Sequence, residues 1–332
     1  MMRYRKLGRT GLVVSEIGVG GGGIGHVWGE TTDEAIAETI ALAMSEGINF
    51  FDVAPSYGNG AAERNLGRAL VEAPQGVGRD MLVATKVALS EEDLDDIPGA
   101  VERGNHESLE RLRRERIDIF QLHNTITTER GRYRRSISVD DAMLAVETLH
   151  RLKQDGLTRF IGITGMGEAE RVREVLGRAE LDTVQCYYNL LNDSNARPLP
   201  PGSSLHDHGQ LLPLAAELGL GVIGIRNLSG GALSNGLDRE VEPQSLVAMD
   251  ARRAETLRFL KDDGIPLSRW SARFALQQAA ISSVVPGVKN SDELADQIAA
   301  VNMPDIDHDQ LARIDALRAQ DFGLPQPDDR VL

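Results

Sequence analysis

Cysteine is almost absent from this chain of 332 residues, in which Cys186 is the only one. One cysteine excludes an internal disulfide and a zinc site built from several cysteines, and its apolar surroundings favour core packing. Long hydrophobic runs are missing too, because no segment reaches the roughly 18 apolar residues that a membrane span needs. The basic start, MMRYRKLGRTG, is not followed by the apolar segment and cleavage site of a secretory signal. We therefore expect a cytoplasmic protein without a membrane role.

Positive charge is also scarce, since 36 Lys and Arg residues face 50 Asp and Glu residues and leave a formal net charge of −14. Such an acidic chain opposes binding to the phosphate backbone of nucleic acids, although a local basic pocket can still hold one anionic cofactor. The acidic surface does not specify self-association, so an oligomer is compatible with the sequence. These features favour a small molecule as the partner.

Short apolar segments rich in Val, Ile and Phe alternate with longer segments whose apolar residues recur every three or four positions. This alternation is typical of parallel strands joined by amphipathic helices. Acids near Asp33 and Asp140 mark helix starts. The predicted strands span residues 12–20, 48–54, 81–87, 117–124, 159–165, 183–190, 221–227 and 282–288. Eight such units predict an α/β fold of the (β/α)8 TIM-barrel type, as a single domain over residues 1–332.

A glycine-rich run, GGGGIG (20–25), follows the first predicted strand. It leaves open a doubly wound sheet, in which glycines after the first strand approach a dinucleotide phosphate. A run of glycines alone is a weak signal, and a loop at the mouth of a barrel explains it equally well. The number of strand and helix units favours the barrel.

Two segments rich in turn-forming residues, 192–209 and 228–249, interrupt the repeat. Because loops after barrel strands carry binding groups, we expect both to select the substrate. His206 and His208 resemble a metal-binding pair. No acid or third histidine stands at helical spacing nearby, so we predict that both are solvated loop residues.

Four polar residues lie at or just after the ends of predicted strands two to four: Asp52, Tyr57, Lys86 and His123. In a barrel these strand ends converge on one mouth. A charged pair of Asp52 and Lys86 would favour tyrosinate at Tyr57 and lower its pKa, so that the phenol can donate a proton to a carbonyl oxygen held by His123. Taken singly, each residue has a structural explanation as an ion pair, loop aromatic or core histidine. Together they predict carbonyl reduction.

Three segments, FFDVAPSYGNGAAERNLGRAL (50–70), VATK (83–86) and DIFQLHN (118–124), resemble the catalytic signatures of the aldo-keto reductase superfamily. The opening RKLGRTGLVVSEIGVG resembles the family's N-terminal β-hairpin, which closes the barrel bottom, and the resemblance extends to SVVPGVKNSDEL (283–294). It implies Tyr57 as general acid, Asp52 and Lys86 as the pair that tunes it, and His123 as the residue that orients the carbonyl. It also implies hydride transfer from a nicotinamide cofactor without a metal.

The resemblance implies cofactor contacts along the chain. Thr164 and Gln185 correspond to residues that hold the nicotinamide carboxamide, while Ile225 and Arg226 stand where relatives place a stacking aromatic. Lys289 corresponds to the contact with a 2′-phosphate, which favours NADPH, with NADH also compatible. The full set of expected cofactor residues is Gly22, Asp52, Thr164, Gln185, Arg226, Leu228, Gly230, Pro286, Gly287, Lys289, Glu293 and Gln297.

Trp28 and His26, in the loop after the first strand, are expected to line the substrate pocket. The sequence thus predicts an NADPH-dependent reductase of aldehydes or ketones, or the reverse reaction as an NADP-linked sugar or alcohol dehydrogenase. Two other functions remain open: a barrel that binds NADP(H) to regulate a partner, and a metal-dependent hydrolase. The hydrolase would need several strand-end His and Asp ligands. Only one strand-end histidine is present, so we expect no metal.

Overall fold

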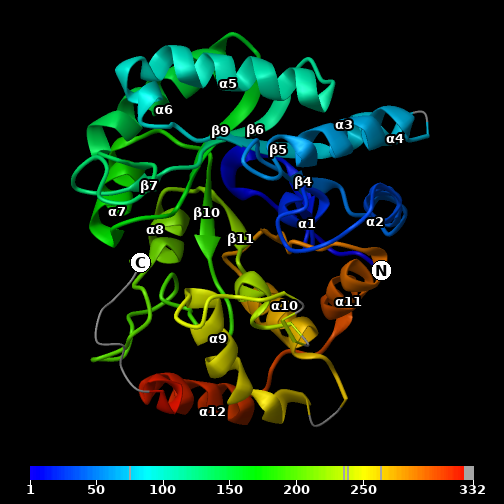
Figure 1. Cartoon of the computed structure of the whole chain (residues 1–332), viewed down its shortest axis with the longest axis vertical. Coiled ribbons are helices and arrows are strands. Elements are labelled where there is room, and N and C mark those ends of the chain that lie inside the picture. Colours follow the sequence, from blue (N-terminus) through cyan, green and yellow to red (C-terminus); the bar gives the residue numbers. More distant parts are fainter. Residues whose placement is uncertain (75, 235, 238, 262–263, 325–332) are drawn as a thin grey trace.

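Eight parallel strands form the centre of the molecule (Figure 1). The structure is a computed structural model that describes residues 1–324 except 75, 235, 238, 262 and 263. The order is β12-β11-β10-β9-β6-β5-β4-β3. Hydrogen bonds from Gly20 N to Pro286 O (2.8 Å) and from Gly18 N to Val284 O (2.8 Å) join the two outer strands and close the ring. The predicted (β/α)8 barrel is confirmed. The strands are β3 (Val19–Gly20), β4 (Phe50–Asp52), β5 (Leu82–Val87), β6 (Ile117–Leu122), β9 (Thr158–Thr164), β10 (Thr183–Tyr187), β11 (Gly221–Ile225) and β12 (Ser283–Val284).

Amphipathic helices surround the strands. In α2 the residues Ile36, Ile40 and Ala43 recur at helical spacing and are buried, and each isoleucine contributes about 1.5–3 kcal/mol by leaving water. Thr32 caps α2 and Ser138 caps α6, next to the predicted acids. The helices are α1 (Gly21–Ile24), α2 (Asp33–Ser45), α3 (Ala61–Glu72), α4 (Val77–Asp80), α5 (Ile97–Leu112), α6 (Val139–Gln154), α7 (Ala169–Arg178), α8 (Leu211–Glu217), α9 (Leu246–Glu255), α10 (Leu267–Gln277), α11 (Ser291–Ala299) and α12 (His308–Ala319). The short 3-10 helices are η1 (Gly8–Thr10), η2 (Glu92–Asp95), η3 (Ser229–Gly231), η4 (Arg258–Lys261), η5 (Ala300–Asn302) and η6 (Asp321–Gly323).

The N-terminal hairpin consists of β1 (Tyr4–Lys6) and β2 (Val13–Ser15), which pair antiparallel. The predicted strand over 12–20 is therefore two strands, because β2 pairs with β1 and only β3 joins the barrel. Leu7 and Val14 are buried with Phe50 and other residues of the barrel interior. The predicted hairpin is confirmed, and its apolar side chains cover one end of the barrel core.

The predicted glycine loop after the first strand is partly helical, since α1 spans Gly21–Ile24. Segment 192–209 contains no helix or strand in the structure, whereas 228–249 includes η3 and, from Leu246, the start of α9. Residues 235 and 238 of that segment, and 325–332 at the end of the predicted domain, lie outside the described residues. A further short pair, β7 (Thr125–Ile126) and β8 (Ser136–Ile137), frames the loop after β6.

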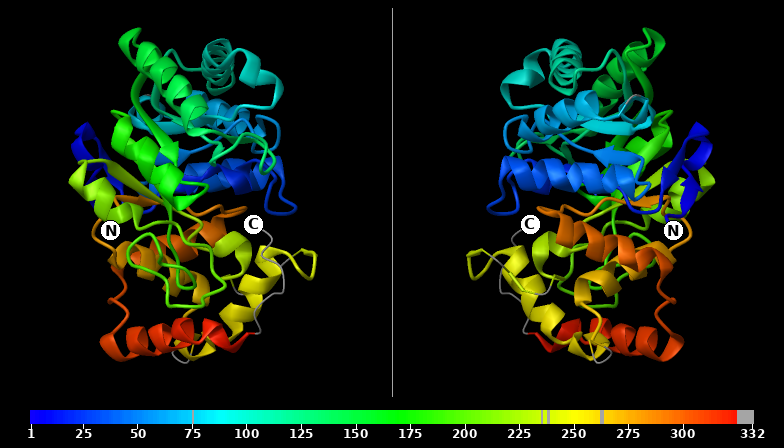
Figure 2. Two further views of the ribbon diagram at one scale, coloured as in Figure 1. Left: turned by 90° about the vertical axis from the view of Figure 1, so that its left-hand side faces the viewer. Right: turned by 90° about the vertical axis from the view of Figure 1, so that its right-hand side faces the viewer.

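Helices α5 and α12 lie at opposite ends of the molecule in every view (Figures 1 and 2). Among the described residues, none of the helices is long and apolar enough to span a bilayer. The mouth of the barrel, where the carboxyl ends of the strands meet, holds the cavity described next.

Candidate active site

The end of β4 places the carboxylate of Asp52 inside the barrel, 3% exposed. On the neighbouring strand β5, Lys86 is 1% exposed, and its Nζ donates to Asp52 Oδ2 at 2.7 Å and to Val53 O at 2.8 Å. Two buried ions are stable only if each is paired and hydrogen-bonded, and this pair meets both conditions. The predicted Asp52–Lys86 pair is thus present.

Two amide side chains donate hydrogen bonds to the second carboxylate oxygen of Asp52. Gln185 Nε2 donates to Asp52 Oδ1 at 2.6 Å, although the two residues are 133 positions apart. Gln121 Nε2 approaches the same oxygen at 3.4 Å. Thr164 donates its hydroxyl to Gln185 Oε1 at 3.1 Å and thereby fixes which way that amide faces. Gln121 was missed at the sequence level, although a polar residue within the buried strand β6 was a signal for it.

Tyr57 and His123 lie beside this network. Lys86 Nζ is 4.9 Å from the centre of the Tyr57 ring, and the rings of Tyr57 and His123 meet edge to face with centroids 6.1 Å apart. A hydrogen bond from His123 N to Val87 O (2.8 Å) continues the ladder between β5 and β6 and fixes the histidine at the strand end. All four predicted residues therefore meet at the barrel mouth.

The surroundings shift the pKa of three of these groups. Burial raises the pKa of Tyr57; the charge of Lys86 opposes this and that of Asp52 adds to it. The net rise is opposite to the predicted lowering, because the loss of hydration outweighs the ammonium. Burial opposes the charged form of Lys86, but Asp52 and Tyr57 outweigh it and raise its pKa. Burial, together with the charges of Lys86 and Arg135, lowers the pKa of His123 to about 3, so the imidazole is neutral at pH 7.

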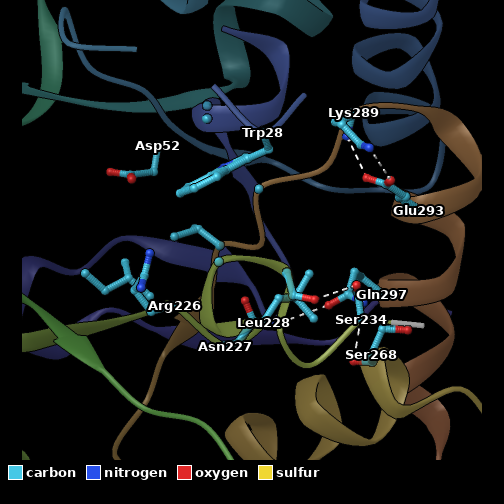
Figure 3. A pocket seen from close by; sticks show the side chains of 18 of the residues that line it. Trp28, Asp52, Arg226, Asn227, Leu228, Ser234, Ser268, Lys289, Glu293 and Gln297 are labelled. Atoms are coloured by element: carbon cyan, nitrogen blue, oxygen red, sulfur yellow. Dashed lines mark hydrogen bonds and ion pairs between the residues drawn. The ribbon is translucent and has the colours of Figure 1, made fainter. Parts of the chain in front are cut away.

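A cavity of about 550 Å³ opens above these residues. Figure 3 shows it running from Asp52 at one end to Lys289 and Glu293 at the other, with Trp28 between. The predicted site residues that line it are Gly22, Trp28, Asp52, Tyr57, His123, Gln185, Arg226, Leu228, Gly230, Gly287, Lys289, Glu293 and Gln297.

Four predicted site residues do not line this cavity. Thr164 is fully buried behind Gln185, and Lys86 lies behind Asp52. Pro286 contributes to the barrel closure through its carbonyl oxygen. His26 is exposed, with a positive φ of 61°, and is not among the residues that line this cavity, so its place in the substrate pocket stays a prediction. In a loop beyond a strand end, the alternation of the strand no longer determines the direction of a side chain.

The backbone after β11 is bent into an unusual conformation along the cavity. Arg226 and Ser229 have φ values of 58° and 45°, a region that non-glycine residues rarely adopt, and Gly230 and Gly231 follow with positive φ as well. Asn189 Nδ2 donates to Arg226 O at 2.9 Å and holds the bend. Leu228 and Gly230, two predicted cofactor contacts, line the cavity along this bend.

The outer end of the cavity lies at the start of α11. Lys289 Nζ is 3.5 Å from Glu293 Oε1, and Lys289 N donates to Glu293 Oε2 at 2.9 Å (Figure 3). The predicted phosphate-binding lysine therefore already has a carboxylate partner, and Asp292 lines the same end. Gln297, a predicted cofactor contact, accepts a hydrogen bond from Asn227 at 3.1 Å and links α11 to the bend after β11.

The Nε1 side of the Trp28 indole lies against two glycines in the middle of the cavity. A Cβ on Gly22 would lie 2.1 Å from Trp28 Nε1, and one on Gly287 would lie 2.3 Å from it. The guanidinium of Arg239 covers the ring, 5.5 Å from its centre. A side chain at either position would therefore displace the indole from its place.

Several cavity residues were missed at the sequence level. Tyr187 lies two positions after Gln185 on β10, so the two-residue period of a strand was a signal that both face inward. Asn227, Ser268 and Arg239 come from loops and helix starts, where no pattern was available.

His206 and His208 are half-buried rather than fully solvated as predicted. Their rings meet at 4.8 Å, and His208 packs edge to face on Tyr187 at 4.9 Å. Burial lowers the pKa of His208 to about 3, with further contributions from His206 and Arg226. Within the described ranges, His, Cys, Asp and Glu residues form no group of three that could hold a metal ion. Cys186 is fully buried, as predicted.

Comparison with known proteins agrees with this geometry. The model of the Aldo/keto reductase family matches residues 16–319. L-galactose dehydrogenase of Arabidopsis thaliana is 32% identical over 324 residues, which cover 95% of this chain and 94% of that protein. The NADH-specific methylglyoxal reductase of Escherichia coli is 26% identical and covers 91% and 94%.

Among solved structures, the holo form of an aldo-keto reductase from Bacillus halodurans has a TM-score of 0.72 at 24% identity and covers 96% of each chain. The glycerol dehydrogenase of Gluconobacter oxydans has a TM-score of 0.72 at 22% identity and covers 99% of each. These two structures share the fold. The family match and the L-galactose dehydrogenase relative go further: this chain belongs to the aldo/keto reductase family, whose members are nicotinamide-dependent oxidoreductases of small molecules.

Proposed function

We propose that this protein interconverts a carbonyl compound and its alcohol with Tyr57 as the general acid, and that it accepts NADPH and also NADH. One observation carries the proposal: Asp52 joins Lys86 and Gln185, and Tyr57 and His123 lie at the same cavity. We further propose that residues 1–332 form one barrel domain.

Tyr57 and His123 supply the polar groups for a carbonyl oxygen. A phenol with a raised pKa stays protonated at neutral pH and so has a proton to donate. A neutral imidazole can donate one N–H to the same oxygen without adding a positive charge. The ammonium of Lys86, 4.9 Å from the phenol ring, favours the tyrosinate that forms when the proton leaves.

The Asp52 network holds these groups in place. Asp52 keeps Lys86 charged, because an ammonium without a carboxylate partner at 1% exposure would lose its proton more readily. Thr164 fixes the Gln185 amide, whose position at the cavity wall suits a hydrogen bond to a carboxamide. We propose Asp52, Lys86 and Thr164 as positioning residues and Gln185 as a cofactor contact.

The chemical groups that line the cavity suit an extended dinucleotide. Amide and carboxylate groups lie at the inner end, glycine backbone in the middle, and Lys289 at the outer end. When bound there, a nicotinamide cofactor supplies or accepts the hydride. Arg226 and the backbone of Leu228 and Gly230 would meet its phosphates, because a guanidinium and the amides of a tight bend both bind anions.

The Lys289–Glu293 pair bears on the choice between NADPH and NADH. Lys289 offers a cation to a 2′-phosphate, but Glu293 already neutralises it, and a carboxylate repels that phosphate. A carboxylate can instead accept a hydrogen bond from a free ribose hydroxyl. We therefore propose that both cofactors bind, and that this pair sets their ratio.

Oxidation of a sugar or alcohol is the second candidate for the direction of the reaction. The relative with 32% identity over 95% of the chain is named for oxidation of L-galactose, which favours testing that direction. The same four residues can catalyse the oxidation, because the tyrosinate of Tyr57 would then accept the proton that its phenol donates in the reduction.

The test follows NADPH and NADH oxidation with aromatic, aliphatic and sugar aldehydes, and NADP⁺ and NAD⁺ reduction with L-galactose and glycerol. Tyr57→Phe is compared with wild type and with Tyr4→Phe, which alters an exposed tyrosine of the hairpin. Loss of a general acid lowers kcat by about 10² to 10⁴, so only Tyr57→Phe is expected to fall that far.

The outcomes separate the candidate functions. Turnover that depends on Tyr57 supports the proposed reaction and its acid. Cofactor binding without turnover of any aldehyde or alcohol would overturn it and favour a regulatory barrel. Full activity of Tyr57→Phe would refute the assigned proton donor.

A further inference from the structure

A second cavity of about 540 Å³ opens on the other side of His123 and Lys86. It lies between the loop after β4, one side of α5 from Ala100 to Arg111, and the loop that joins β7 to β8. His123 lines both cavities, so its ring is a shared wall. A group bound in the second cavity therefore lies beside the residue that is proposed to orient the carbonyl.

Basic side chains dominate this second cavity. Arg103 and Arg111 have acidic partners, with Arg103 3.6 Å from Asp93 and Arg111 2.5 Å from Glu63. Arg134 and Arg135 also line it, and neither forms an ion pair within the described part of the chain. In a protein of net charge −14, two such guanidinium groups beside the candidate active site form a local basic surface.

The position of Arg135 is held by the strand that carries His123. The buried side chain of Asn124 donates to Arg135 O at 2.9 Å and exchanges two further hydrogen bonds with Leu89. Arg135 has a φ of 60°, a left-handed conformation that non-glycine residues rarely adopt, and Ser136 after it pairs with Thr125.

The hydrogen bond from Asn124 and the pairing of β7 with β8 thus hold the backbone of Arg135 in this left-handed conformation. After burial and Lys86, the charge of Arg135 is a third cause of the lowered pKa of His123, which agrees with its nearness to that ring.

We propose that the second cavity is a substrate subsite in which Arg134 and Arg135 bind an anionic oxygen group, a carboxylate or a phosphate, carried by the molecule whose carbonyl lies at His123. This inference rests on the proposed carbonyl chemistry and names its substrate class. A guanidinium suits both anions, because its N–H groups match two oxygens at once. The subsite would favour acidic aldehydes and ketones over neutral ones.

The test compares pairs of aldehydes that differ in charge. For the carboxylate the pair is 4-carboxybenzaldehyde and its neutral amide, 4-formylbenzamide. For the phosphate it is glyceraldehyde 3-phosphate and glyceraldehyde. The variant is Arg134→Gln/Arg135→Gln, and the control is Arg132→Gln, which removes one charge from the same loop but pairs with Glu168 outside the cavity.

We expect wild type to have a kcat/KM about tenfold higher for the charged member of one pair, a preference that shrinks at high salt. The double variant should lose that preference, and Arg132→Gln should keep it. Which pair shows the effect identifies the anion.

Failure of the subsite and failure of the proposed function give different results. If neutral aldehydes react and neither pair shows a charge preference, the subsite is refuted and the function stands. If no aldehyde reacts, calorimetric titration with 4-carboxybenzyl alcohol and with 4-(hydroxymethyl)benzamide decides the subsite. Tighter binding of the acid by wild type than by the double variant supports it, and equal binding overturns it.

Discussion

Replacing Asp52 with asparagine is expected to destabilise the barrel as well as to abolish activity. The carboxylate is 3% exposed and accepts hydrogen bonds on both oxygens, from Lys86 at 2.7 Å and from Gln185 at 2.6 Å. An asparagine amide has only one acceptor oxygen, so its NH2 group would face a donor on one side or the other. The Lys86 ammonium, 1% exposed, would lose its counter-ion.

The size of the effect follows from the geometry. At 2.7 Å and an effective dielectric constant of about 20, the attraction between the charges is about 6 kcal/mol. Burial of the two ions offsets part of it, and removing one partner of a buried pair typically costs about 3–5 kcal/mol. At about 2.1 cal/mol/K of unfolding entropy per residue, that corresponds for a chain of 332 residues to a fall in Tm of roughly 4–7 °C.

The assay is thermal unfolding of Asp52→Asn, Lys86→Met and the double variant at pH 7 and pH 9.5. The double variant should lose less than the sum of the single ones, because it leaves no unpaired charge. In Asp52→Asn, burial without a carboxylate lowers the folded-state pKa of Lys86 below its unfolded value. The unfolded chain then binds more protons, so the deficit of this variant should shrink as pH rises toward 9.5.

Two results would refute this reasoning. One is a fall in Tm of less than about 2 °C for Asp52→Asn at pH 7. The other is a deficit that is equal at both pH values, which would mean that the pair is not the source of the stability.

Four further predictions concern pH and cofactor binding. Since the pKa of His123 is about 3, kcat/KM for reduction should stay level between pH 5 and 8, and a step near pH 6.5 would contradict the neutral imidazole. Since the pKa of Tyr57 is raised, alcohol oxidation, which needs the tyrosinate, should increase up to pH 10 or above, and a plateau below pH 9 would contradict it. Glu293→Gln should lower the Kd for NADPH about fivefold relative to NADH, as measured by fluorescence titration, whereas Asp292→Asn, which lacks the contact with Lys289, should change the ratio less. Thr164→Val should raise the Kd for both cofactors about tenfold, because the Gln185 amide loses its hydroxyl donor, and an unchanged Kd would separate Thr164 from cofactor binding.

Much of the fold was predictable from the amino-acid sequence because it depends on local patterns. The spacing of Ile36, Ile40 and Ala43 is enough to predict a helix with one buried face, and α2 has that face. Asp52, Lys86 and His123 are polar residues at the ends of apolar strands, so the barrel topology alone brings them to one mouth.

Other features were decided only by the tertiary structure, because they join residues far apart in the chain. The division of 12–20 into β2 and β3 depends on pairing with β1 and β4, and residue types do not encode a strand's partner. The contact between Gln185 and Asp52, 133 positions apart, follows from the register of strands around the barrel. The raised pKa of Tyr57 is a balance between burial and charge that only three-dimensional distances determine.

The loops show the same limit most clearly. His208 was expected in solvent, yet it packs on Tyr187, and His26 was expected in the pocket, yet it is exposed. A strand or helix carries a period that fixes the direction of each side chain, whereas a loop has none. The sequence by itself therefore determined the barrel and the residues at its strand ends, and packing of the loops decided which side chains enclose the cavity.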